Sequence, residues 1–223
     1  MKRLCLAIAA LALGTACSTL STIHGARTLE PGQVEVGFAT SLQRGGNPIT
    51  IGTIPLPQPE LALRFGLRDN MDLGWRLYPV GAQVDLRYRF YHQDNLHVAF
   101  DPALGALWVP LYGGTLGGQG SVTVRAPVIA EYEIGPYSSI MGGPTLILRR
   151  QRNAIEAPGI EGARLTRLDA FAGGGVRYEV HPKQIVLGAS FDLYAQPARH
   201  AGPAFSVGLD FGIVPKARAR SRQ

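Results

Sequence analysis

Twelve charged residues stand on the polar side of segments in which polar and apolar residues alternate. Arginines and carboxylates are mixed among them, and glycine, alanine and serine fill many of the positions between. Charges of opposite sign can be buried only as pairs, because an unpaired buried charge costs several kcal/mol. We therefore expect an ion-pair network inside a narrow interior, made by Arg64, Asp72, Arg76, Asp85, Arg87, Arg125, Glu131, Asp169, Arg177, Glu179, Asp192 and Asp210.

Residues that could catalyse a reaction or bind a metal are sparse. The five histidines, His24, His92, His97, His181 and His200, show no metal-ligand spacing, so we expect no metal and no cofactor. The glycine-rich stretch 113–120 lacks the Lys-Ser or Lys-Thr of a phosphate-binding loop and is interpreted as a loop. Glycines 173–175 fall within an expected strand, where they indicate a bend or close packing. We expect no enzymatic activity.

The elements that position these charges are strands. Period-two alternation predicts strands at 34–42, 61–68, 71–78, 84–91, 96–108, 121–134, 138–150, 165–180, 184–194 and 204–214, and no amphipathic helix. Short turns at 68–70, 92–95, 135–137 and 181–183 alternate with longer loops near 43–57, 109–120, 151–164 and 195–203, and the connection at 79–81 is short. Ten strands place both chain ends on the same side.

The formal charge of +6 belongs to the two ends of the chain. Lys2 and Arg3 begin the sequence, and four basic residues lie within 216–222; the other sixteen basic residues match the sixteen acidic ones. A neutral body does not form a nucleic-acid surface, so we expect no nucleic-acid partner.

The first residues have the features of an export signal. A basic start, the apolar run 4–13 and small residues at 14–16 predict a signal peptide over 1–16. The sequence Leu-Gly-Thr-Ala-Cys at 13–17 resembles a bacterial lipobox, although glycine replaces the usual leucine at Gly14. That resemblance implies acylation of Cys17, a tether over 17–31 and contact with the lipoprotein-processing machinery; an ordinary signal peptide is the alternative.

The last strand resembles the signal read by the barrel-assembly machinery of the bacterial outer membrane. Its residues are Ser206, Gly208, Phe211 and Ile213, although this chain continues into a basic tail at 215–223. Aromatic residues also gather near the expected strand ends, as in the girdles of membrane barrels. One rim would hold Trp108, Tyr112, Tyr194 and Phe205, and the other Tyr88, Phe90, Tyr132, Tyr137, Tyr178 and Phe211.

These features together resemble small outer-membrane β-barrel lipoproteins. The implied fold is a single antiparallel up-and-down transmembrane barrel of ten strands over 32–214, embedded in outer-membrane lipid, with the oligomeric state open. A sealed interior is favoured over a narrow pore, and the implied role is envelope-structural, adhesive or pore-forming. The alternatives are a soluble, lipid-tethered β-sandwich or lipocalin-like binder, and a barrel enzyme of the omptin or lipid-modifying type, for which His200, Glu156 and Glu161 are the only candidates in the outer loops.

Overall fold

The computed structural model describes residues 25–44, 56–79, 81–109, 116–157, 160–182, 184–196 and 204–214. Its strands are β1 (Val34–Arg44), β2 (Leu56–Arg68), β3 (Met71–Tyr78), β4 (Gly81–Gln93), β5 (Leu96–Phe100), β6 (Ala103–Val109), β7 (Leu116–Gly135), β8 (Ser138–Ala157), β9 (Ile160–Val180), β10 (Ile185–Ala195) and β11 (Ala204–Ile213). None of the described residues forms a helix long and apolar enough to cross a membrane.

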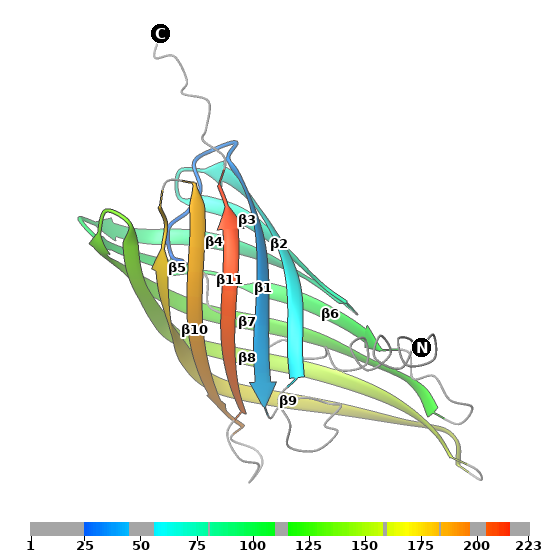
Figure 1. The fold of residues 1–223 in the computed structure, drawn as a ribbon. Coiled ribbons are helices and arrows are strands. Elements are labelled where there is room, and N and C mark those ends of the chain that lie inside the picture. The colour runs from blue at the N-terminus through cyan, green and yellow to red at the C-terminus, as the bar shows by residue number, and fades with distance from the viewer. Residues whose placement is uncertain are drawn as a thin grey trace, which may run out of the picture.

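The strands close into one antiparallel barrel (Figure 1). Apart from β5 and β6, each strand pairs with its neighbour in sequence, and β1 pairs with β11 over Val36–Arg44 to complete the ring. β5 and β6 both lie between β4 and β7, so they are two parts of one strand interrupted at Asp101 and Pro102. Proline cannot donate to the strand ladder, which explains the break. The barrel therefore has ten strand positions, as the alternation predicts.

The two ends of the barrel differ in their connections. Tight turns join β2 to β3, β4 to β5, β7 to β8 and β9 to β10, at residues 69–70, 94–95, 136–137 and 181–184. We call this the short-turn end; β1 begins there and β11 ends there. The opposite side, where β7, β8 and β9 sweep past their neighbours, is the long-strand end (Figure 1).

The strands β7, β8 and β9 are longer than the sequence pattern predicts. They have 20, 20 and 21 residues, and strand pairing between β8 and β9 continues to Ala157 and Ile160. The expected loop over 151–164 was therefore wrong, and the loop at 109–120 ends where β7 begins. Polar and apolar residue types no longer alternate in this region, which is why the sequence pattern did not predict the longer strands.

Apolar side chains face outward and polar ones inward. Trp75, Leu146, Leu168 and Leu209 are at least half exposed, whereas Asp72, Arg76, Glu131 and Asp192 are buried. A soluble barrel or sandwich would have the reverse arrangement, because its apolar face forms the core. The exterior is that of a transmembrane barrel, and the lipocalin-like alternative was wrong.

All six aromatic residues expected in the rim at the short-turn end are on the exterior. Tyr88, Phe90, Tyr132, Tyr137, Tyr178 and Phe211 are all exposed. At the other rim Tyr194 was wrongly placed, because it alternates in phase with the inward-facing Asp192 and is buried. Phe205 is half-buried; Tyr112 and the side chain of Trp108 lie outside the described residues.

Candidate functional site

The interior between β2, β3 and β4 is filled by a network of two arginines and two aspartates. Arg64 donates to both Asp72 and Asp85, and Nη2 of Arg87 lies 2.8 Å from Oδ2 of Asp72. All four side chains are buried. Gly74 makes the network possible, since a Cβ at that position would overlap the Asp85 carboxylate.

A second network joins β9 to β11. Nη2 of Arg177 lies 2.9 Å from Oε2 of Glu179 and 2.6 Å from Oδ2 of Asp210. Gly188 lies on β10, the strand between β9 and β11. A Cβ at Gly188 would overlap both the Arg177 guanidinium and the Asp210 carboxylate. Asp210 is half-buried, whereas the other two side chains are buried.

Further from the short turns, the interior also holds an apolar cluster. Ile147, Phe171, Tyr194 and Ala204 form one buried cluster. The guanidinium of Arg149 lies 4.9 Å from the centre of the Phe171 ring, and its Nη2 lies 3.7 Å from Oδ2 of Asp169.

The remaining expected interior charges lie between these groups. Arg76, Arg125 and Asp192 are buried, and Asp192 is within electrostatic reach of both arginines. Asp85 joins this middle layer to the first network, because its Oδ2 lies 4.0 Å from Nε of Arg76. The structure thus places eleven of the twelve expected charges in buried positions and Asp210 in a half-buried one.

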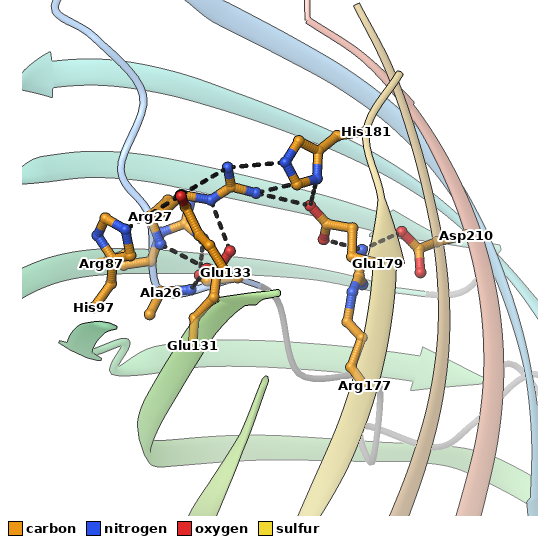
Figure 2. Close-up of polar contacts among 11 residues, drawn as sticks. Ala26, Arg27, Arg87, His97, Glu131, Glu133, Arg177, Glu179, His181 and Asp210 are labelled. Carbon is orange, nitrogen blue, oxygen red and sulfur yellow. Dashed lines mark hydrogen bonds and ion pairs between the residues drawn. The ribbon is translucent and has the colours of Figure 1, made fainter. Parts of the chain in front are cut away.

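The N-terminal segment, residues 25–33, lies across the mouth of the barrel at the short-turn end (Figure 2). The backbone nitrogens of Ala26 and Arg27 donate to Oε2 of Glu131, at 2.7 and 3.0 Å, and Nε of Arg27 donates to Oε1 at 2.7 Å. Glu131 is fully buried. One interior carboxylate therefore accepts three hydrogen bonds from this segment.

The Arg27 guanidinium also contacts a second carboxylate on β7 and one on β9. Its Nη1 lies 3.3 Å from Oε1 of Glu133, and its Nη2 lies 3.5 Å from Oε1 of Glu179. Nη1 is also 3.2 Å from Nε2 of His181 (Figure 2). We call this set of contacts the Arg27 clamp: Arg27 with Glu131, Glu133, Glu179 and His181.

His181, in the turn after β9, is neutral in this arrangement. An arginine can only donate, and its Nη1 and Nη2 lie 3.2 Å from Nε2 and 3.4 Å from Nδ1 of His181, so at least one ring nitrogen must be unprotonated to accept. Burial, followed by the charge of Arg27, lowers the pKa of His181, while Glu131 and Glu133 oppose that shift.

Other contacts hold the rest of the segment in place. The Arg87 side chain donates to the carbonyl of Gly25, the backbone nitrogen of Leu29 donates to Asp72 at 3.1 Å, and Thr28 donates to the carbonyl of Asp69 at 2.7 Å. Ala26 packs in an apolar cluster with Ala99, Ile129 and Met141.

The segment then turns into β1 beside β2. Gly32 has a φ of +82° in this turn, and its nitrogen donates to the carbonyl of Gly66 at 2.9 Å. A Cβ on Gly66 would overlap the carbonyl of Glu30, so the close approach needs glycine there. A hollow of about 330 Å³ remains at the mouth, between the segment and side chains that include Glu35 and Arg177.

The sequence pattern did not predict this docking. It assigns a tether to 17–31, yet the described part of that range is held inside the mouth. Ser18–Pro31 has neither alternation nor helical periodicity, and the partners of Arg27 lie more than one hundred residues away, so no local signal marks the contact. Cys17, His24, His200 and the basic tail lie outside the described residues.

The remaining expected sites have these positions. On β11, Ser206 and Gly208 face inward, while Phe211 and Ile213 face outward. His92 and His97 stack at 4.4 Å across β4 and β5, and Nε2 of His97 lies 3.3 Å from Oε1 of Glu133. Within the described ranges no group of histidines, cysteines and carboxylates could hold a metal ion.

The closed ring, apolar exterior and ion-paired interior define a membrane-spanning β-barrel of the outer-membrane type. Solved structures similar to this chain include Ail, the attachment invasion locus protein of Yersinia pestis, with 14% identity, a TM-score of 0.45 and coverage of 84% of this chain and 100% of that one. Neisserial surface protein A has 9% identity, a TM-score of 0.40 and coverage of 81% and 95%. OprG from Pseudomonas aeruginosa has 10% identity, a TM-score of 0.39 and coverage of 85% and 99%. No family model and no curated protein matches the sequence.

Proposed function

We propose that this protein is a non-enzymatic lipoprotein of the bacterial outer membrane, with a sealed barrel that serves envelope structure or adhesion. The Arg27 clamp is the observation that carries the proposal. Among the described residues, a segment is fixed across the mouth by charged hydrogen bonds, above an interior that contains paired charges, and both would obstruct a solute.

The orientation follows from the position of the chain ends. β1 begins and β11 ends at the short-turn end, so an acylated Cys17 would enter the leaflet on that side, which we assign to the periplasm. Gly25 follows Cys17 by eight positions, and an extended chain of that length spans up to about 28 Å. That reach is enough to join the mouth to the membrane surface.

The long-strand end would then face outward. A membrane-crossing strand needs about 9–11 residues, and β10 and β11 have 11 and 10. With 20 or 21 residues, β7, β8 and β9 would project well beyond the lipid. This projecting ribbon is the surface through which we propose a structural or adhesive role. The described histidines support a non-enzymatic reading, since His181 belongs to the clamp and His92 stacks on His97.

Conductance across planar bilayers tests the sealed interior. We expect no stable current steps from the wild-type protein, whose folding is checked by the different migration of unheated and boiled samples in SDS gels. Regular single-channel openings from folded wild-type protein would contradict the proposal. Acylation is tested separately: globomycin should cause the precursor of the wild type to accumulate and should leave Cys17→Ser unaffected.

A further inference from the structure

Charged side chains are rare on the exterior of the barrel. Among the described strand residues with exposed side chains, three are charged, and all three are arginines: Arg68, Arg150 and Arg152. Arg68 ends β2 at the short-turn end, whereas Arg150 and Arg152 lie together on β8 toward the long-strand end. Among the exposed side chains that the structure describes, the two β8 arginines are therefore a basic pair with no other charged residue on the same strand.

The neighbours of this pair mark the upper edge of the apolar belt. Arg150 is flanked across the sheet by Val122 on β7 and Leu168 on β9, which are 50% and 73% exposed. Arg152 is flanked by Gly120 and Thr166. Toward the short-turn end the same outward row of β8 continues with Leu148 and Leu146, both more than half exposed.

The height of the pair agrees with this boundary. Twelve residues separate Ser138, where β8 leaves the short turn, from Arg150. At about 3.3 Å per residue and a tilt of about 45°, that distance rises about 28 Å, close to the thickness of the apolar band of such barrels. Arg150 thus lies at the headgroup level, and Arg152 roughly 5 Å above it.

Two arginines two residues apart on one strand face have side chains about 6.6 Å apart at their bases, near enough to approach one headgroup. The planar guanidinium pairs with phosphate through two parallel hydrogen bonds, and a headgroup interface weakens such pairs less than bulk water does. No carboxylate among the described residues contacts either arginine.

We propose that Arg150 and Arg152 form a binding site for the phosphate groups of a phosphorylated glycolipid in the outer leaflet. The site would fix the height and rotation of the barrel in the membrane. The inference rests on the orientation given under the proposed function, because the pair meets the outer leaflet only if the long-strand end faces outward.

The test is native mass spectrometry of the full-length protein, folded in detergent and titrated with bis-phosphorylated lipid A. We expect Arg150→Gln/Arg152→Gln to bind roughly tenfold more weakly, the loss of two interfacial ion pairs. The matched control is Arg68→Gln/Arg89→Gln, which removes two positive charges near the short turns and should bind like the wild type. Removing the phosphates from lipid A should weaken its binding to the wild type. The loss should equal that caused by the Arg150→Gln/Arg152→Gln substitutions.

Unchanged affinity of the β8 variant, or an equal loss in the control, would overturn the proposal. So would equal binding of phosphatidylglycerol, since the site would then recognise any anionic lipid. Heat-modifiable migration verifies that each variant is folded, and Arg152→Gln alone replaces the double variant if that protein does not fold. A folded, non-conducting barrel without phosphate preference would refute the lipid site and leave the proposed function standing.

Discussion

The two ends of the barrel interior are closed by different means. At the short-turn end, residues 25–33 cross the mouth and are held by the Arg27 clamp, above the Arg64 and Arg177 networks. Toward the long-strand end, the interior holds the apolar cluster of Ile147, Phe171, Tyr194 and Ala204, with the pair of Arg149 and Asp169 beside it. Paired charges require specific partners, whereas apolar side chains require only volume, so the two ends should respond differently to substitution.

The largest effect is expected from breaking the network between β2 and β4. Asp72→Ala removes the shared partner of Arg64 and Arg87 and leaves two buried guanidinium groups with too little negative charge. We expect a loss of about 3–5 kcal/mol in the free energy of unfolding, measured by urea titration in lipid vesicles. Asp69→Ala, in the exposed turn nearby, is the control and should unfold at the same urea concentration as the wild type. An equally small shift for Asp72→Ala would show that the network is dispensable.

Loss of the clamp should be smaller and local. Arg27→Ala removes the Nε donor of the buried Glu131 carboxylate and keeps the two backbone donors, a cost of about 1–3 kcal/mol. We expect a cysteine placed at Thr28 to react faster with a maleimide in this variant, while the barrel stays heat-modifiable. Protection equal to that of the parent Thr28→Cys protein would contradict the role of Arg27.

The apolar cluster should tolerate a change of volume better. Ile147→Val keeps the character of the cluster and removes one methylene, so we expect a loss of about 0.5–1.5 kcal/mol. The same urea titration measures it. A loss as large as that of Asp72→Ala would remove the distinction between the two ends.

The smallest effect is a pH dependence confined to the mouth. The pKa of His181 is lowered in the folded protein. The stabilisation by neutral His181 is therefore complete above the ordinary histidine pKa of about 6.5, and it is lost as the pH falls from there through the lower pKa of the folded state. Protonation removes the acceptor for Arg27 and places a positive charge beside it, although Glu131, Glu133 and Glu179 offset part of that charge. Labelling of the Thr28→Cys protein should therefore accelerate on acidification. A His181→Asn background should flatten this profile, and an identical profile would exclude His181 as its cause.

Sequence patterns predicted the parts of this molecule that depend on local order. Alternation at Leu61–Leu67 or Val84–Tyr88 assigns both the strand and the face of each side chain, because the period of a strand is two residues. It fails at Arg68 and Tyr91, which are exposed because the strand register shifts beside them. The same alternation would have placed Tyr194 correctly, because it lies two residues after the inward-facing Asp192 and therefore on the same face of the strand. The docking of Arg27 could not, since Glu131 and His181 become its neighbours only after the ring closes.

The pairing of β1 with β11 has a consequence for biogenesis. The ring is completed by the first and last strands, whose partners, such as Val36 and Ile213, lie at opposite ends of the sequence (Figure 1). Contacts of such long range slow folding, because loop closure must precede any gain from pairing. Until the last strand has been delivered, the first has an open edge and the mouth has no complete rim to receive Arg27. The protein should therefore need a chaperone or an assembly partner to cover that edge throughout its transit.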